Sequence, residues 1–259
     1  MATFRVAAEP TIDLTELTAA LQPVLNLRTG NVHGFEALLR GPGGNNVNPP
    51  ALFRRARREG WAEALEYRAR ELALQAARRH LRYKEVLFLN GDVRYPIDSA
   101  CYPHLVLEIN EARNVDKRTV EKLQRDGLSL YLDDYGVSHA NLSRLLDISP
   151  SGLKVDRGII QGIASDPRRF TVAQNLAKLA NELDLSIVAE GIETAEDLSA
   201  VINAGFQYGQ GYYLGRPELI PDRYRLSQLR SAIRASATPA ASESGSPASD
   251  FGAAVAAMV

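Results

Sequence analysis

A polar side chain stands near the end of each apolar, β-like run of this 259-residue chain. Along the sequence these residues are Gln22, Glu36, Asn90, Glu108, the pair Asp133–Asp134, Lys154, Glu190 and Gln210. Burying an unpaired carboxylate costs several kcal/mol or forces it to take up a proton. Carboxylates that converge in one fold therefore need a cation, and clusters of oxygen ligands suit Mg²⁺ or Mn²⁺.

The overall composition excludes several classes of protein. Hydrophobic residues make up 45% and charged residues 24%, as in an ordinary soluble protein. A formal net charge of -1 argues against general binding of DNA or RNA polymers, which use a basic surface. No apolar stretch approaches the roughly 20 residues that span a bilayer, and MATFRVAAEP lacks a signal-peptide pattern. The single cysteine, Cys101, cannot form an internal disulfide, so we expect a cytoplasmic protein.

The spacing of the runs predicts the architecture. The turn at Arg28–Asn31 is too short for a parallel crossover, so its two flanking strands must be antiparallel. Strand–helix alternation follows, beginning with a helical stretch from Ala51 to Arg82 that Gly60 interrupts. We therefore expect an α/β fold, a modified (β/α)₈ TIM-like barrel with an antiparallel first strand.

Composition also predicts the domain boundaries and the last elements. We expect an N-terminal extension over 1–18, the barrel over 19–236 and a disordered, Ala/Ser/Pro-rich tail over 237–259. The last strand is expected at Phe206–Leu214, and the closing helix at Asp222–Ser236. In such barrels the chemistry lies where the strands run out into the following loops.

Six ordered motifs resemble the EAL family of cyclic di-GMP phosphodiesterases. They are the Gln-Pro at Gln22 followed by Glu36-Ala37-Leu38, then LEINE, LDDYG, LKVDR, VAEGIET and QGYYLGRP. The resemblance covers roughly residues 20 to 220. It implies hydrolysis of cyclic di-GMP to linear pGpG by a two-metal mechanism with Mg²⁺ or Mn²⁺. It also implies a homodimer. Separately, we expect regulation to come from a protein partner, dimerisation, expression or the tail.

The resemblance implies a role for each matching residue. A first divalent ion would be held by Glu36, Asn90, Glu108 and Asp133, and a second by Asp133, Asp134 and Glu190. Catalysis would involve Lys154, Glu190 and Gln210, with Lys154 positioning the attacking water. The substrate would be contacted by Gln22, Leu39, Arg40 and Asp156. Glu111 and Glu193 would hold the surrounding residues in place without binding the ions themselves.

The chain departs from the family in the loop after the paired aspartates. It reads DDYGVSHANL where active members usually read DDFGTGYSSL, so Ser138 replaces a glycine and His139 an aromatic residue. Enzyme is our preferred interpretation, and the alternative is a weak or inactive effector that binds cyclic di-GMP or a protein partner. A barrel enzyme of another class, with one metal and a lysine base, is a third reading that Arg40 and the paired aspartates disfavour.

An arginine-rich run, Phe53–Arg58, belongs to the first predicted helix. We interpret it as the solvated face of that helix, the alternative being a surface that steers an anionic nucleotide toward the site.

Overall fold

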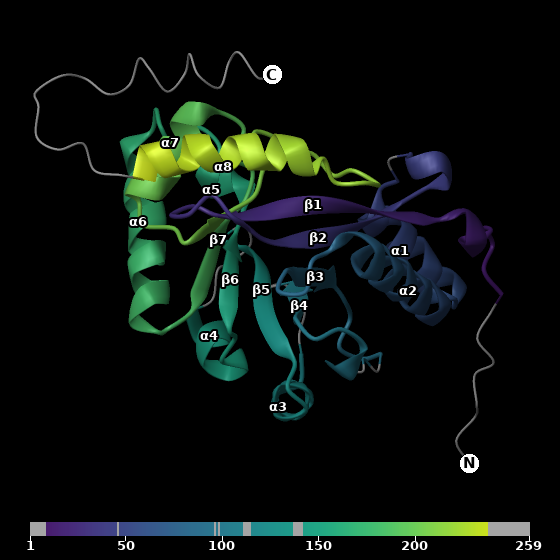
Figure 1. Ribbon diagram of the computed structural model, residues 1–259. Helices are drawn as coiled ribbons and strands as arrows, with labels where there is room; N and C mark the ends of the chain where they lie inside the picture. The colour runs from purple at the N-terminus through teal and green to yellow at the C-terminus, as the bar shows by residue number, and fades with distance from the viewer. Residues whose placement is uncertain are drawn as a thin grey trace, which may run out of the picture.

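The strands close into a barrel in sequence order, as the computed structural model of the chain shows (Figure 1). The structure describes residues 9–45, 47–95, 97, 99–110, 115–136 and 142–237. The strands are β1 (Thr18–Asn26), β2 (Val32–Arg40), β3 (Val86–Asn90), β4 (Leu105–Asn110), β5 (Ser129–Tyr135), β6 (Gly152–Val155), β7 (Ser186–Ala189) and β8 (Tyr208–Gly209). Strand β1 pairs antiparallel with both β2 and β8, and the other neighbours are parallel, which confirms the predicted barrel with a reversed first strand.

Helices surround the barrel and follow β2 and each strand from β4 to β8. They are α1 (Pro49–Glu59), α2 (Ala62–His80), α3 (Lys117–Arg125), α4 (Leu142–Ile148), α5 (Arg157–Ile160), α6 (Pro167–Glu182), α7 (Ala195–Asn203) and α8 (Arg223–Ala237). Short 3₁₀ turns lie at Leu14–Glu16, Pro42–Gly44 and Ser99–Cys101. Asn48, Asp166 and Thr194 begin α1, α6 and α7 by accepting backbone N–H groups of the first turn. Gly60 ends α1 in the left-handed conformation, at the predicted break.

Two apolar layers hold the barrel together. Outside it, alternate strand residues such as Leu107, Leu132 and Leu153 pack against the helices in one large cluster. Inside it, a smaller cluster of residues from five strands fills the interior: Val24, Phe88, Val106, Tyr131 and Val188. The interior is thus a packed core rather than a channel, as in other barrels of this type. This core closes the barrel below the carboxyl ends of the parallel strands.

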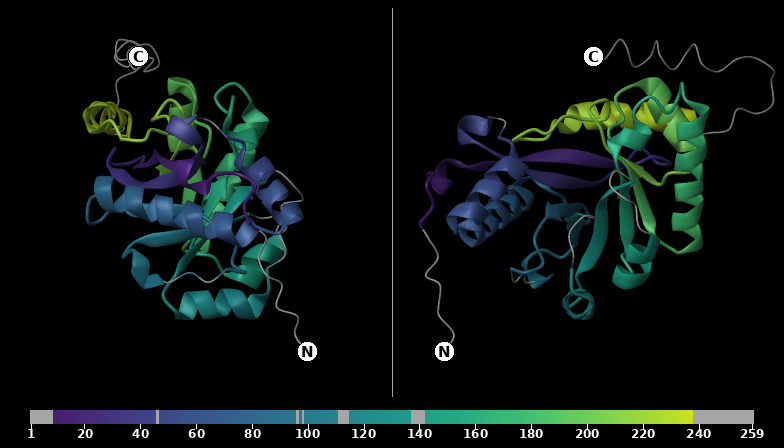
Figure 2. Two further views of the ribbon diagram at one scale, coloured as in Figure 1. Left: turned by 90° about the vertical axis from the view of Figure 1, so that its right-hand side faces the viewer. Right: turned by 180° about the vertical axis from the view of Figure 1, so that it is seen from behind.

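The last helix, α8, returns to the start of the chain. It runs along β1 in all views (Figures 1 and 2). Gly30, in the β1–β2 turn, has a positive φ, and a Cβ there would lie 2.5 Å from the carbonyl oxygen of Arg230. Arg223 pairs with Glu85 before β3, with nitrogen–oxygen distances of 2.5 and 2.7 Å. The carboxyl-terminal helix therefore fixes the reversed first hairpin onto the barrel.

The last strand is shorter than predicted. Only Tyr208 and Gly209 pair as strand, although apolar residues extend to Leu214. At Gly211 a Cβ would lie 2.1 Å from the carbonyl oxygen of Ile192, so the backbone must pass against the loop after β7. Beyond this crossing the Tyr213 amide bonds to Ile192 instead of continuing a ladder.

Two predictions can be compared with the described residues alone. The predicted tail lies outside them except for Ala237, where α8 ends. Within the part of the chain that the structure describes, no helix is long and apolar enough to cross a membrane.

Candidate active site

The polar side chains at the strand ends follow from the alternation of the strands. In β3, β4 and β5 an interior apolar residue is followed two positions later by a polar one, which faces the same side. The pairs are Phe88 and Asn90, Val106 and Glu108, Tyr131 and Asp133, and, running past the end of β7, Val188 and Glu190. A polar layer therefore lies directly above the apolar core, at the carboxyl ends of the parallel strands.

The reversed first strand obeys the same rule in the opposite direction. In β1 the polar Gln22 precedes the core residue Val24 by two positions. Because β1 is antiparallel, residues earlier in its sequence lie toward the polar layer. Gln22 pairs in register with Glu36 of β2, so an amide and a carboxylate from the hairpin enter the layer together.

Lys154 of β6 is the centre of this layer. Its Nζ lies 2.6 Å from Glu190, 2.8 Å from Glu108, 3.0 Å from Glu36 and 3.5 Å from Asp133, measured to one carboxylate oxygen of each. The lysine is only 1% exposed. A buried ammonium is tolerated only with charged partners, and here four strands or strand ends supply them.

Amide side chains complete the arrangement around Glu36. Asn90 donates Nδ2 to Glu36 at 2.7 Å and to Glu108 at 3.0 Å. Gln210 donates Nε2 to Glu36 at 2.7 Å and to Gln22 at 3.0 Å, and Gln22 in turn donates to the Gly215 carbonyl. The resulting network orients the two carboxylates that lie deepest.

Asp133 and Asp134 both reach the layer because β5 contains a bulge. The pairing with β6 steps from Leu132 to Tyr135 while β6 advances only two residues, so β5 carries one extra residue. Asp134 has a φ of 56°, in the left-handed region that non-glycine residues rarely adopt. After the extra residue, Tyr135 packs with the outer cluster as Leu132 does. The bulge thus lets two consecutive carboxylates serve one site.

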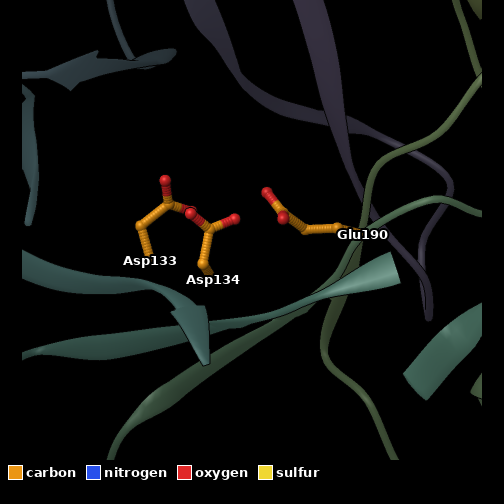
Figure 3. Close-up of side chains that lie close together, drawn as sticks. All are labelled: Asp133, Asp134 and Glu190. Carbon is orange, nitrogen blue, oxygen red and sulfur yellow. The ribbon is translucent and has the colours of Figure 1, made fainter. Parts of the chain in front are cut away.

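Three carboxylates form a candidate metal cluster. Oxygen atoms of Asp133, Asp134 and Glu190 lie within 4.8 Å of one another. Figure 3 shows their carboxylates gathered at the ends of the side chains, with Glu190 facing the aspartate pair across the site. Asn110, at the end of β4, donates Nδ2 to Asp134 at 2.5 Å and so holds its orientation.

The burial of so many charges shifts their pKa values. Burial raises the pKa of Glu190 to about 8 and that of Asp134 to about 6, with neighbouring carboxylates adding to both shifts. Burial and the Glu36 charge also raise the pKa of Glu108. Glu36 differs, because Lys154 and the donated amides outweigh burial and lower its pKa. Burial alone would lower the pKa of Lys154, but the four carboxylates raise it instead.

These residues fit divalent cations. Five carboxylates face one ammonium, so the layer needs more positive charge than the described side chains supply. Asp133 Oδ1 is buried, and its ion pair with Lys154 is the longest of the four, at 3.5 Å. Carboxylate and amide oxygens are the donors that hard cations prefer. The donor set is therefore that of a site for divalent ions held by oxygen.

The polar layer forms the floor of a cavity of about 790 Å³. Of the remaining predicted residues, Leu39, Asp156 and Glu193 line this cavity. Arg40 is not among the lining residues; its Nη1 donates to the Leu39 carbonyl at 2.9 Å. Glu111 lies outside the described residues, as do Ser138 and His139.

Some lining residues were not predicted from the sequence. The sequence predicts no role for Asn110, yet it contacts Asp134. Arg54 and Arg57 of α1 are exposed, as the interpretation of a solvated face predicts, and with Phe53 they also line the cavity. The helical spacing of the run was visible in the sequence, but the direction in which that face points was not.

Comparison with known proteins identifies the family. The family model described as EAL domain matches residues 5–217. The chain belongs to the EAL domain family. The cyclic di-GMP phosphodiesterase NbdA of Pseudomonas aeruginosa is 30% identical over 228 residues, which cover 78% of this chain and 29% of NbdA. The chain thus spans less than a third of the length of this relative.

Solved EAL structures share the fold. The PaMucR phosphodiesterase in complex with c-di-GMP is 26% identical, with a TM-score of 0.68 over 79% of this chain and 92% of that one. A standalone versatile EAL protein from Vibrio cholerae O395 in its c-di-GMP-bound form is also 26% identical, with a TM-score of 0.69 over 81% and 94%.

Proposed function

We propose that this EAL domain hydrolyses cyclic di-GMP to linear pGpG with two Mg²⁺ or Mn²⁺ ions. One observation carries the proposal: Lys154 lies within 3.5 Å of four carboxylates, two of which also belong to the Asp133–Asp134–Glu190 cluster. The cyclic di-GMP phosphodiesterase activity of NbdA and the c-di-GMP in the PaMucR and Vibrio cholerae structures support this choice of substrate.

Different residues would bind the two ions, and Asp133 would bind both. Glu36, Asn90, Glu108 and Asp133 would hold the first ion, and Asp133, Asp134 and Glu190 the second. When bound, such a pair of ions supplies a nucleophile at neutral pH and neutralises charge developing on the phosphoryl group. For Asn90 this requires its carbonyl oxygen, whereas its amide nitrogen now contacts Glu36 and Glu108.

Lys154 would act as a fixed cation rather than as a base. Without metal, the surrounding carboxylates raise the pKa of Lys154, which favours an ammonium that donates a hydrogen bond to the attacking water. Glu190, 2.6 Å from Lys154, is the nearest carboxylate that could accept that proton. Water adds across one bond between phosphorus and a 3′ oxygen. That oxygen leaves as a hydroxyl, and the linear product keeps a 5′-phosphate.

Three further proposals concern the protein in the cell. We propose that the chain is cytoplasmic, forms a homodimer and is regulated by a protein partner. Sedimentation of the purified chain tests the dimer, since a single species with the mass of one chain at micromolar concentration contradicts it.

A binding protein without turnover is the second candidate. The sequence of the loop after Asp134 favours it, because Ser138 and His139 replace the usual glycine and aromatic residue. This candidate keeps the cavity and its ligand but loses the cleavage step.

Chromatography of the reaction products separates the two candidates. The chain is incubated with Mn²⁺ and cyclic di-GMP, beside Glu36→Ala, Lys154→Ala and the control Lys178→Ala, whose side chain is exposed on α6. Linear pGpG formed by the wild type and the control alone supports the enzyme. Binding of the nucleotide with no product, and product restored in Ser138→Gly/His139→Tyr, supports the effector. Absence of both binding and product contradicts both candidates.

A further inference from the structure

Helix α1 presents one basic stripe to the cavity. The lining residues Pro50, Phe53, Arg54 and Arg57 follow one another at the spacing of a single helical face. Proline and phenylalanine make the first part of the stripe apolar, and the two arginines make the second part cationic. The helix is therefore a wall of the cavity and not only part of the outer ring.

The two cavity arginines differ from the other arginines of the same helix. Arg55 and Arg58 lie on another face, and their guanidinium groups contact Glu59 at 3.0 and 3.3 Å. The guanidinium groups of Arg54 and Arg57 are exposed and form no ion pair or hydrogen bond with any residue that the structure describes. Two unpaired cations thus face the space above the polar layer.

The net charge of the site indicates how much positive charge an anionic ligand would require from elsewhere in the cavity. Five ionised carboxylates and one ammonium leave four negative charges, which two divalent ions would neutralise. A cyclic dinucleotide with two phosphodiesters carries two further negative charges. With both ions bound, the polar layer is neutral overall and can bind the phosphodiester that is cleaved. The negative charge of the second phosphodiester must then be matched by positively charged groups elsewhere in the cavity.

The opposite wall does not supply that charge. Helix α1 follows β2, whereas Asp156 and Arg157 follow β6, four strands away in the closed barrel of eight. There the positive charge of Arg157 is offset by Asp156 and by Glu193, all three of which line the cavity. The side formed by α1 is therefore the more positive of the two walls.

We propose that Arg54 and Arg57 bind the phosphodiester of the cyclic dinucleotide that is not cleaved. This inference rests on the proposed function and adds to it an orientation of the substrate. The cleaved phosphodiester lies at the acidic cluster of β5 and β7, and the other lies toward α1. Arginine suits this task because its planar group donates several hydrogen bonds to phosphate oxygens at once.

Removal of each arginine tests the proposal. Arg54→Gln, Arg57→Gln and the double variant are compared with Arg58→Gln, which removes the same charge from the same helix but does not line the cavity. Binding of cyclic di-GMP is measured by calorimetry with Ca²⁺ in place of the catalytic ion, from 50 to about 400 mM NaCl. Because charge-assisted hydrogen bonds to phosphate are roughly twice as strong as neutral ones, we expect each cavity variant to raise Kd about tenfold or more at low salt.

The salt dependence and the kinetics identify what the arginines contact. Loss of a phosphate contact makes Kd less sensitive to NaCl, and raises KM of the Mn²⁺ reaction while kcat stays within about twofold. Arg58→Gln is expected to match the wild type in both.

Three results would overturn the proposal. Cavity variants with wild-type Kd and salt dependence overturn it and leave the proposed function standing. A raised Kd with unchanged salt dependence also overturns it, and assigns the arginines to the guanine edge instead. A wild-type chain that neither binds nor cleaves cyclic di-GMP overturns both this inference and the proposed function.

Discussion

Lys154 Nζ lies 2.6 Å from Glu190 Oε1, at a point where three further carboxylates also surround the ammonium. The lysine lies in β6 and the glutamate just past the end of the paired strand β7, whereas the contact of the same lysine with Glu36 of β2 crosses the barrel. It joins the chemistry of the site to the stability of the fold, because neither charge is tolerated in the interior alone.

Removal of the Lys154 charge should therefore affect both stability and turnover. We expect Lys154→Met to lower the free energy of unfolding without metal by about 3 kcal/mol or more at pH 7, since it leaves buried carboxylates uncompensated. Turnover should fall at least about 100-fold. Urea unfolding and product assays measure the two effects. The control is Lys178→Met, whose lysine is 73% exposed, and equal unfolding energies for both variants contradict this account.

The conformation of Asp134 predicts an inverted preference between glycine and alanine. At a φ of 56° alanine is strained and glycine is not, so Asp134→Gly should be about 1 kcal/mol more stable than Asp134→Ala. At the neighbouring Asp133, which does not have a positive φ, the alanine variant should be the more stable of the two. Thermal unfolding of the four variants tests the bulge, and the same order at both positions would argue against it.

Metal binding should release protons and weaken at low pH. Without metal, burial raises the pKa of Glu190 to about 8 and that of Asp134 to about 6, so at pH 7 part of the site is protonated. A cation must displace these protons, and Mn²⁺ affinity should rise as pH rises from 6 to 8. Calorimetry in two buffers of different ionisation enthalpy measures the release. An apparent binding enthalpy independent of the buffer, with a constant affinity over this range, contradicts the shifts.

A largely buried histidine of β2, His33, predicts a second pH effect. His33 stacks on Tyr208 with ring centroids 4.0 Å apart, and burial lowers the pKa of His33 to about 4. Below its ordinary pKa of 6.5 the unfolded chain takes up a proton that the folded chain does not, so folding loses stability as pH falls.

The size of the His33 effect can be isolated with His33→Phe, which keeps an aromatic ring on Tyr208. Between pH 6.5 and 5 the wild type should lose roughly 1–2 kcal/mol more of its unfolding free energy than the variant does. Parallel stability–pH curves for the two chains would show that the histidine is not held neutral by the fold.

The sequence predicted the barrel and the polar layer because both depend on local patterns. The short turn at Arg28–Asn31 requires an antiparallel hairpin, and strict alternation places Glu108 and Asp133 on the same side as Val106 and Tyr131. Residues from distant strands then converge because parallel strands end at one rim. Even the break in alternation at Asp134 was visible as two consecutive aspartates.

Features that depend on packing between segments were not predictable in this way. The end of β8 is set by the approach of Gly211 to the Ile192 backbone, which apolar residues up to Leu214 do not reveal. The contact from Asn110 to Asp134 depends on the register of β4 against β5. Periodicity also showed that α1 has a basic face, but the angle at which a helix packs on the barrel decides what such a face covers.

The number of divalent ions bound by the chain tests the central claim most directly. Equilibrium dialysis with Mn²⁺ and cyclic di-GMP, followed by elemental analysis, gives that number for the wild type and for Asp134→Asn. We predict two ions per chain for the wild type, and a second site weakened about 10-fold or more in the variant, which keeps the shape of Asp134 but loses a charge. A wild-type chain that takes up no Mn²⁺ at millimolar concentration with the nucleotide present would contradict the account.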